Sequence, residues 1–515
     1  MSKFVPSPQQ AAFLDWVSNG TGSCIVEAVA GAGKTTTLLE AVDRTGGGVA
    51  MLAYNKKIAD EIKEKLAKRG VDWKNVEAGT VHSFGLRAFS KTFGKPEIDD
   101  RKTFKIIDLI AAENDVALNH PLLTFSTTIA KLVSFAKQRA LGIIGSIHDS
   151  KRWWDIVEHF DVFEEEEEQA AGREIISLAI GVLNRSNAET KVIDFDDMVY
   201  LPVLHKCRFW QYRWVFVDEA QDTNPARRAL VRAILRRDGR LVAVGDRHQA
   251  IYGFTGADSD SLDLIKHDFN AIELPLTVTY RCPKSVVEKA RGYVSHITAH
   301  ESAPEGIVTS IDMAQLYEHN QLGAGSAILC RNTKPLVALA FDLIRRKIPC
   351  RVEGRDIGKG LIKLATKWKS VKTIHGLETA LIRYRDAQVT RAKAAGRELV
   401  AQTIEDQVAT LLVVADECRK AGNDNIPAVV ASIQSLFEDN VDRMLVLSTG
   451  HKSKGREWST VFLLDMAGTI PSRYARKAWQ IEQENNLAYV MITRAQETLI
   501  DVIVPQKPHV DREAA

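Results

Sequence analysis

Short apolar runs alternate with amphipathic stretches in two regions of the chain. The first region covers residues 1 to about 85 and about 190 to 270, and the second begins near Ile272 and resumes near Met444. Strands that alternate with helical patterns are typical of α/β proteins with parallel sheets. The pattern therefore predicts an α/β fold. Strands of the second region are expected at Ala327–Leu329, Met444–Leu447 and Val461–Leu464.

A polar, mostly helical stretch interrupts each region. The first contains the acidic run Phe163–Gln169, most simply a solvated helix face or a loop. In the second, basic residues outnumber acidic ones, and Trp368 and Tyr384 lie among them. Such a mixture suits a nucleic-acid backbone, and a solvated helix face explains it equally well. The expected domains are 1–85 with 190–270, carrying the helical insertion 86–189, and 271–364 with 436–515, carrying the short helical insertion 365–435.

A glycine-rich turn follows the apolar run Ser23–Val26, which reads as a strand, and a helix is expected over Thr36–Asp43. The turn has the spacing of a phosphate-binding loop, with Ala28 in place of the first glycine. Its small residues let backbone N–H groups surround a phosphate, while Lys34 reaches the β- and γ-phosphates and the Thr35 hydroxyl binds Mg²⁺. The expected nucleotide-binding residues here are Ala28, Ala30, Gly31, Ala32, Gly33, Lys34, Thr35 and Thr36.

An acidic pair follows a second apolar run, Trp214–Val217, which is typical of a buried parallel strand. Asp218 and Glu219 then lie at the carboxyl end of that strand, where open α/β sheets bind ligands. Asp218 can hold Mg²⁺, usually through water, and Glu219 can orient and deprotonate an attacking water. Together with the loop, the pair predicts an ATP hydrolase that uses Mg²⁺.

Composition narrows the class of protein only slightly. A chain of 515 residues is too long for one core, so two to four domains are expected. The formal net charge is +2, so any surface that binds nucleic acid must be a local patch. The six cysteines form no CxxC or Cys/His cluster, and no 18-residue apolar run exists. We therefore expect a reducing, cytoplasmic location, no membrane segment and no zinc or disulfide framework.

Further motifs follow in the order "PSPQQAA", "AVAGAGKT", "MLAYNKKIADEI", "GTVHSF", "DFDDM", "VDEAQDTN", "VGDRHQAIYGFTGA", "YRCP", "STGHKSKGREW" and "ENNLAYVMITRA". Over almost its whole length the chain resembles superfamily 1 DNA helicases of the UvrD/Rep/PcrA type. The resemblance implies two RecA-like P-loop NTPase domains in tandem, each with an inserted, mainly helical subdomain, and an ATP cleft between them. It also implies ATP and Mg²⁺ as cofactors, and movement along single-stranded DNA, typically from 3′ to 5′, in replication, repair or recombination.

The same resemblance implies roles for residues around the nucleotide. Gln9 would read the adenine, and Tyr280 would stack on it. Gln249 would sense the γ-phosphate, and Glu457 would lie near the sugar. Arg281 and Arg494 resemble the two arginine fingers of the family, whose positive charge stabilises the phosphoryl-transfer transition state.

On the DNA side, the resemblance implies that Tyr252 and Phe254 stack on bases, a contact that ignores sequence. His82, Asn224 and His451 resemble residues that lie near DNA, and Tyr54 is a further aromatic candidate. Single-stranded DNA and single/double-strand junctions are the expected partners, and protein partners are not indicated. In the second insertion, the basic residues expected on the DNA backbone are Lys367, Lys369, Lys372, Arg383 and Arg385.

The chain departs from the family pattern at three places. Thr36 stands where an arginine often covers one face of adenine, and Phe254 with Thr255 replaces the tryptophan and arginine of the usual motif. The second insertion is much shorter than its counterpart in UvrD-type enzymes. Two alternatives to a helicase stay open, namely a DNA-binding module that uses ATP as a switch and a translocase that strips proteins from DNA without unwinding it.

Overall fold

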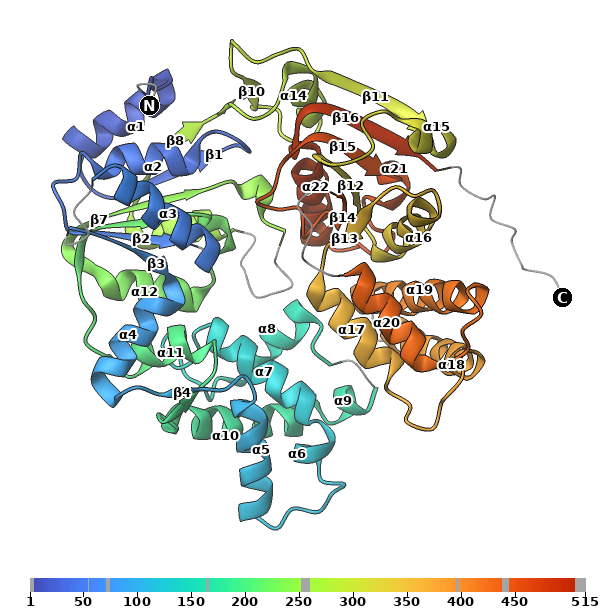
Figure 1. Cartoon of the computed structure of the whole chain (residues 1–515). Helices are drawn as coiled ribbons and strands as arrows, with labels where there is room; N and C mark the ends of the chain where they lie inside the picture. Colours follow the sequence, from blue (N-terminus) through green and yellow to red (C-terminus); the bar gives the residue numbers. More distant parts are fainter. Residues whose placement is uncertain are drawn as a thin grey trace. The chain divides into compact units, whose positions relative to one another are not determined.

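The chain folds into two compact units, Met1–Thr277 and Val278–Ala515, each built around one six-stranded sheet. The computed structural model describes residues 4–53, 55–70, 75–163, 166–251, 260–394, 398–437 and 444–504 (Figure 1). All strand pairs within the two large sheets are parallel. The prediction of tandem RecA-like α/β domains is therefore confirmed. In the described part of the chain, no helix is both long and apolar enough to cross a lipid bilayer.

The first sheet places its central strands beside the glycine-rich loop. Its strand order is β3-β2-β6-β7-β1-β8. β1 and β2 are buried almost throughout because helices cover the sheet, which is why they read as continuous apolar runs. The strands are β1 (Cys24–Ala28), β2 (Val49–Ala53), β3 (Val76–Thr80), β6 (Tyr212–Val217), β7 (Leu235–Gly245) and β8 (Ile272–Leu276). The surrounding helices are α1 (Pro8–Asn19), α2 (Lys34–Val42), α3 (Lys56–Lys68), α12 (Pro225–Ile234) and α13 (Ser261–Phe269).

The edge strand β8 corrects one expected boundary. The expected second α/β domain begins at residue 271, yet β8 pairs in parallel with β1, with Cys24 opposite Ile272. The first unit therefore extends to Thr277. The short apolar run of β8 carries no mark of the sheet that it joins, so the sequence could not decide between the two domains.

A helical subdomain occupies the middle of the first unit. Its core is formed by apolar residues from Ala88 to Cys207, with Trp153 fully buried. The acidic run is only partly a solvated face, because Phe163 is buried and Glu168 binds the Thr128 hydroxyl. The elements are α4 (Val81–Phe93), β4 (Glu97–Ile98), α5 (Lys102–Glu113), α6 (Pro121–Thr124), α7 (Ser126–Gln138), α8 (Ser150–Phe160), α9 (Glu166–Ala170), α10 (Gly172–Ala188), β5 (Val192–Ile193) and α11 (Asp197–Leu204).

Four charged residues are enclosed in this helical subdomain, and we call them the buried charge cluster: Lys102, Lys137, Asp194 and Asp197. The Lys102 ammonium lies 2.7 Å from the Asp197 carboxylate. The Lys137 ammonium lies 2.6 Å from Asp194 and 2.7 Å from Asp197. Both aspartates come from the "DFDDM" motif, so this motif ties α5 and α7 to the segment that leads into α11.

The second unit repeats the α/β architecture. Its sheet order is β11-β16-β15-β12-β14-β13, and the three strands expected from the sequence are confirmed as β12, β14 and β15. The strands are β11 (Ile307–Asp312), β12 (Ser326–Cys330), β13 (Cys350–Val352), β14 (Leu445–Thr449), β15 (Trp458–Leu464) and β16 (Ala495–Ile503). A separate short pair is formed by β9 (Val278–Thr279) and β10 (Thr298–Ala299). Its helices are α14 (Lys284–Ala290), α15 (Met313–Glu318), α16 (Thr333–Arg345), α21 (Met466–Thr469) and α22 (Ala478–Ile492).

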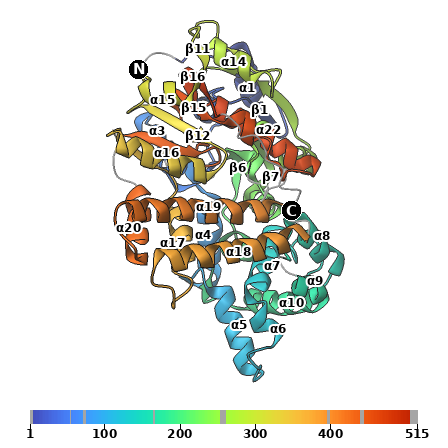
Figure 2. The ribbon, with the colours of Figure 1, turned by 90° about the vertical axis from the view of Figure 1, so that its right-hand side faces the viewer.

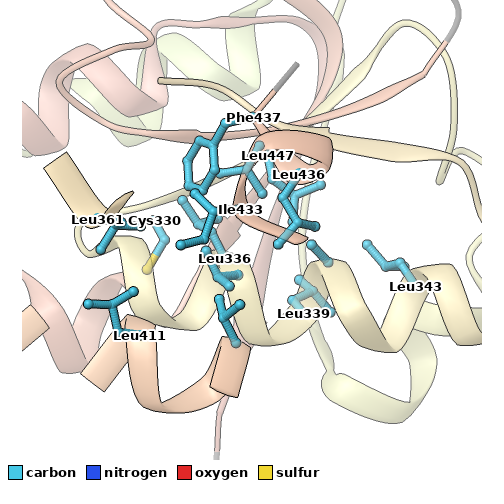
Figure 3. Packing of buried hydrophobic residues seen from close by; sticks show 14 of the residues in the cluster. Cys330, Leu336, Leu339, Leu343, Leu361, Leu411, Ile433, Leu436, Phe437 and Leu447 are labelled. Carbon is cyan, nitrogen blue, oxygen red and sulfur yellow. The ribbon is translucent and has the colours of Figure 1, made fainter. Parts of the chain in front are cut away.

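Four helices form the insertion of the second unit, and Figure 2 shows them beside α16. They are α17 (Arg355–Ala365), α18 (Ile374–Ala394), α19 (Glu398–Lys420) and α20 (Ile426–Leu436). In Figure 3, Leu336 of α16 lies close to Ile433 of α20, and Leu339 and Leu411 belong to the same apolar cluster. The insertion and its sheet domain thus share one continuous apolar core.

Candidate nucleotide and DNA sites

The glycine-rich loop has the backbone that a phosphate site requires. Gly31 and Gly33 have φ values of 72° and 77°, in the left-handed region that glycine tolerates best. Gly33 caps α2, which begins at Lys34, two residues before the expected start. The N–H groups of the first helical turn, which have no acceptor within the helix itself, therefore lie at the loop, where they and the helix dipole favour an anion.

The structure brings the loop and the acidic pair together. The Lys34 ammonium lies 3.5 Å from the Glu219 carboxylate. The Thr35 hydroxyl donates to the Asp218 carboxylate over 3.3 Å. Glu219 has a φ of 52°, which is uncommon for a residue other than glycine, and its N–H donates to Asp218 over 2.9 Å. Four residues predicted from two distant motifs are thus placed in one cluster at the carboxyl ends of β1 and β6.

The charges in this cluster are not balanced. One ammonium faces two carboxylates, and Asp218 is 6% exposed. Burial and the neighbouring charge of Glu219 raise the pKa of Asp218 to about 6, although Lys34 opposes the shift. The Thr35 hydroxyl and the Asp218 carboxylate are oxygen donors of the kind that Mg²⁺ prefers, so the residues present fit this ion.

Two polar residues that the sequence analysis missed connect the acidic pair to Gln249. Gln221 donates to the Glu219 carboxylate over 2.5 Å, and its carbonyl accepts the N–H of Asp246 over 3.1 Å. Asp246 in turn accepts the amide of Gln249 over 2.7 Å. Gln221 lies in "VDEAQDTN" and Asp246 in "VGDRHQ", so their place inside recognised motifs was the available signal.

Gln9 uses its amide within the first unit. Its carbonyl accepts the N–H of Thr277 over 2.8 Å, and its NH₂ group lies 2.9 Å from the Thr277 hydroxyl. The neighbouring Gln10 is buried and donates to Thr37 of α2 over 3.0 Å. Both glutamines therefore brace the nucleotide loop and the end of β8, and the adenine-reading role of Gln9 stays a prediction.

Arg281 and Glu457, predicted at the nucleotide, pair with each other inside the second unit. The Arg281 guanidinium donates to the Glu457 carboxylate over 2.6 Å, and Glu457 also accepts the Gln496 amide over 2.9 Å. Tyr280 is 44% exposed, with its ring 4.8 Å from that of His300. An exposed ring beside a paired arginine is compatible with the roles predicted for Tyr280 and Arg281.

Arg494 occupies a different environment. Its side chain is 1% exposed, and its guanidinium donates to the carbonyls of Val490 over 2.8 Å and Arg456 over 3.1 Å. A third bond, over 3.1 Å, reaches the Thr493 hydroxyl. An arginine finger in this position would have to exchange such partners for a phosphate, so the predicted role of Arg494 requires a rearrangement.

The histidines predicted to lie near DNA are uncharged at neutral pH. Burial, helped by the positive charge of Arg227, lowers the pKa of His82 to about 4. Burial, with Arg331 nearby, lowers the pKa of His451 to about 3. The ring of Phe195 lies 6.5 Å from that of His82, edge to face, and Phe195 is 55% exposed. The sequence analysis missed Phe195, although an aromatic residue inside "DFDDM" was a visible signal.

Asn224 has a structural role that the sequence analysis did not foresee. Its side-chain carbonyl accepts the N–H of Arg227 over 2.9 Å and so caps α12. The remaining aromatic candidates for DNA, Tyr54, Tyr252 and Phe254, lie outside the described residues.

The basic stretch of the second insertion is partly a packing surface. The Lys367 ammonium lies 4.1 Å from the centre of the Tyr384 ring, and that ring lies 5.9 Å from Trp368, edge to face. Both rings pack against the core of the second unit. Lys369, Lys372 and Arg383 are exposed, whereas Arg385 pairs with Asp386 over 2.7 Å. The aromatic residues are thus explained by packing, and the exposed cations keep the surface positive.

Comparisons with known proteins agree with this arrangement. The family model described as the UvrD/REP helicase N-terminal domain matches residues 9–270, and the model of the UvrD-like helicase C-terminal domain matches residues 359–504. The chain is 25% identical to the ATP-dependent DNA helicase Rep of Escherichia coli over 55% of its length and 42% of Rep. It is 26% identical to DNA helicase IV of the same organism over 72% of its length and 59% of that protein.

A eukaryotic relative extends the match along the chain. The F-box DNA helicase protein 1 of Schizosaccharomyces pombe is 23% identical over 92% of this chain and 55% of that protein. The chain thus spans about half the length of the curated relatives that it matches.

Proposed function

The chain belongs to the UvrD/REP helicase family, and from this premise we propose that it hydrolyses ATP to move along single-stranded DNA and to separate strands at single/double-strand junctions. The observation that carries the proposal is the cluster of Lys34, Thr35, Asp218 and Glu219. The proposed direction is 3′ to 5′, and the proposed setting is replication, repair or recombination.

The ion pair of Lys34 and Glu219 suggests how the site prepares for hydrolysis. An arriving β/γ-phosphate is a stronger partner for the Lys34 ammonium than one carboxylate is, and Lys34 would turn to it. Glu219 would then lose this cation while keeping its hydrogen bond from Gln221, and its carboxylate would accept a proton from water. Thr35 and Asp218 would hold Mg²⁺, which neutralises charge on the phosphate oxygens when it is bound.

Gln221 and Asp246 connect the nucleotide site to the neighbouring strand β7 by hydrogen bonds. They hold Glu219 and Gln249 in one hydrogen-bonded series from the end of β6 to the end of β7. A residue that senses the γ-phosphate would therefore move with the residue that activates water. Gln249 also precedes Tyr252 and Phe254, the aromatic residues proposed to hold bases, by only a few positions.

On the DNA side we propose neutral contacts around His82. An uncharged imidazole can donate one hydrogen bond to a phosphate, or pack on a base, without adding charge. Phe195 beside it is an exposed ring on which a base can stack, and such stacking is worth about 1–3 kcal/mol per base. Binding through these residues would change little between pH 6 and pH 8, because both histidine pKa values lie below that range.

The test of this proposal uses one protein and two measurements. ATP hydrolysis is measured with and without single-stranded DNA, and strand displacement is measured on duplexes with a 3′ or a 5′ tail. We expect DNA to stimulate hydrolysis and only the 3′-tailed duplex to be unwound. Stimulation without unwinding would support the protein-stripping alternative, and binding of ATP without turnover would support the ATP switch.

The exposed cations of the second insertion are proposed to contact the DNA backbone. Each phosphate contact that is lost should lower the log–log salt slope of single-strand binding by about 0.7. We expect the triple variant Lys369→Gln, Lys372→Gln and Arg383→Gln to show a shallower slope, whereas Arg385→Gln changes it less because Arg385 is paired. Filter binding at several salt concentrations measures the slope, and an unchanged slope in the triple variant contradicts the contact.

A further inference from the structure

A hollow of about 820 Å³ lies in the first unit, and none of its lining residues belongs to the nucleotide site. Its walls come from α4 between Phe84 and Lys91, the segment 203–211 that leads into β6, the start of β3 and the end of α12. In Figure 1 the helices α4, α11 and α12 lie next to one another in the first unit. The proposed function gives this hollow no task.

The hollow lies near the amino ends of the parallel strands, whereas the proposed ATP and DNA contacts lie at their carboxyl ends. Glu77 is the second residue of β3, and Gln211 directly precedes β6, so both mark the amino ends of these parallel strands. His82 and Asp218 follow the carboxyl ends of the same two strands. Since a strand rises about 3.3 Å per residue, most of a strand separates Glu77 and Gln211 from the carboxyl ends of β3 and β6, and α4 connects the two regions, with His82 in its first turn and Phe84 at the hollow.

The floor of the hollow is apolar. Phe84, Ala88 and Ile234 are each no more than 5% exposed, and Cys207 is 7% exposed. Apolar side chains at the bottom of an open hollow of this size offer room and contact area for one large apolar side chain of a ligand.

The rim of the hollow is positively charged and not neutralised. Lys91, Lys206 and Arg208 are exposed, and in the described part of the chain no carboxylate forms an ion pair with any of them. Glu77 is the one carboxylate among the described lining residues, and it already accepts hydrogen bonds from Arg87 and the Tyr212 hydroxyl. Three cations therefore surround an apolar floor without a local counter-charge.

Trp210 adds an exposed aromatic ring to this rim. It is 69% exposed, which is more than any other tryptophan in the described part of the chain. Tryptophan and arginine are enriched among the residues that carry most of the binding energy in protein interfaces. A tryptophan between unpaired cations thus marks the hollow as a docking surface.

We propose that the hollow docks an acidic peptide segment of a partner protein. One aromatic or large aliphatic side chain of the segment occupies the apolar floor, and carboxylates on both sides of it pair with Lys91, Lys206 and Arg208. Trp210 closes over the segment. A nucleic-acid strand fits less well, because its phosphates need cations along a track with repeated stacking platforms, whereas these cations surround a single hollow that contains a carboxylate.

The test measures peptide binding to the full chain by fluorescence anisotropy. The probe is a labelled peptide with aspartates and glutamates around a central phenylalanine, and the matched probe carries asparagine and glutamine instead. We expect saturable, salt-sensitive binding of the acidic probe in the micromolar range and at least about tenfold weaker binding of the amide probe.

Two variants and one control locate the binding surface. Trp210→Ala and the double variant K206E/R208E should each weaken the acidic probe about tenfold or more. Arg237→Glu changes an exposed arginine of the same unit that does not line the hollow, and it should leave binding unchanged. Basal ATP hydrolysis should be kept in all three proteins, which shows that each has folded.

Three results would overturn the inference. They are an absence of saturable binding of the acidic probe, equal binding of the amide probe, and unaltered affinity in both hollow variants. An oligothymidylate that displaces the probe, and that loses its own affinity in K206E/R208E, would assign the hollow to nucleic acid instead. None of these results depends on whether the chain unwinds DNA.

Discussion

Two groups of buried charged residues lie in the first unit, and they differ in whether their positive and negative charges are equal in number. The buried charge cluster of the helical subdomain sets Lys102 and Lys137 against Asp194 and Asp197, two cations against two carboxylates. The nucleotide site sets Lys34 against Asp218 and Glu219, one cation against two carboxylates. The first set is balanced by the protein alone, and the second leaves room for a metal ion and a phosphate.

The pKa values of the aspartates express the same difference. Burial would raise the pKa of Asp197, but Lys137 and Lys102 lower it below its usual range. Burial and Glu219 raise the pKa of Asp218 to about 6, and Lys34 only weakens this shift. The negative charge of Asp197 is therefore favoured by its surroundings, whereas the negative charge of Asp218 is disfavoured. Unfavourable ionisation of this kind marks a functional site better than burial alone does.

The largest expected effect is on ATP hydrolysis, which should depend on the nucleotide site. Glu219→Gln should bind ATP but hydrolyse it about 10²–10⁴ times more slowly, because the group that accepts the proton is lost. Lys34→Ala should abolish hydrolysis, because the phosphates lose their cation. Steady-state phosphate release measures both, with Asp155→Asn on the exposed face of α8 as a control that keeps wild-type turnover. Near-normal turnover by either variant would remove the nucleotide site from this cluster.

The second prediction concerns the stability of the balanced set. Asp197→Asn keeps the shape of the side chain but leaves two buried ammonium groups with one carboxylate between them. Removing one partner of a buried pair typically costs about 3–5 kcal/mol, so we expect the free energy of unfolding to fall by that amount. Urea unfolding of this variant and of Asp155→Asn provides the comparison. A loss no larger than that of the control would mean that the cluster is only a loosely held ion pair.

The third prediction gives the opposite sign at the nucleotide site. The raised pKa means that folded Asp218 holds a proton which the unfolded chain has released, so folding stability is lost as pH rises from about 4 to about 6. Asp218→Asn removes this cost and should stabilise the free protein at pH 7 by about 3 kcal/mol, since the pKa is raised from 3.8 to about 6 and each pKa unit corresponds to 1.36 kcal/mol. The gain should vanish near pH 4, where Asp218 is neutral in both states. A gain that persists unchanged at pH 4 would point to a cause other than charge.

The smallest expected effect is on Asp196, the residue next to Asp197, whose replacement is expected to cost the most stability. Asp196 neighbours Asp197 but binds Ser134 and Gln138 in place of the lysines, and burial raises its pKa to about 6. Asp196→Asn relieves a charge that burial disfavours, as Asp218→Asn does, but it also replaces one of the two carboxylate oxygens that accept from Ser134 and Gln138. A hydrogen bond to a charged group contributes about 1.5–3 kcal/mol, so the two effects oppose each other and the unfolding free energy should change by less than about 1 kcal/mol at pH 7. A loss as large as that of Asp197→Asn in the same urea experiment would show that the whole motif acts as one unit.

The sequence predicted features that lie within one short segment, and it did not predict contacts between residues far apart in the chain. The strand before the loop, the acidic pair after Trp214–Val217 and the three strands of the second sheet depend on short apolar runs, which a single segment can show. The start of α2 was placed two residues late because the cap is the left-handed Gly33, a backbone property that composition does not reveal.

Partners that lie far apart in the chain gave no local signal. The sequence analysis did not single out Lys102 or Lys137, and only the fold brings them to aspartates 57 to 95 residues away. The sequence left a nucleic-acid surface and a solvated helix face equally open for the segment with Trp368 and Tyr384, because the core that these rings cover comes from other helices. Nothing in the sequence around Arg494 indicated that its guanidinium donates to the carbonyl of Arg456, which lies 38 residues earlier. These relations were set by tertiary packing, to which a single sequence gives no access.

One measurement tests most directly whether bound Mg²⁺ and nucleotide compensate the disfavoured negative charge of Asp218. Thermal unfolding of the wild type and of Asp218→Asn is followed at pH 7 with a non-hydrolysable ATP analogue, with and without Mg²⁺. We predict that Asp218→Asn is the more stable protein without ligand, and that Mg²⁺ adds to the analogue's stabilisation only in the wild type, by about 2.7 kcal/mol at a ligand concentration of one hundred times Kd. A free Asp218→Asn protein that is less stable than the wild type, or one that keeps the full Mg²⁺-dependent gain, would contradict the account.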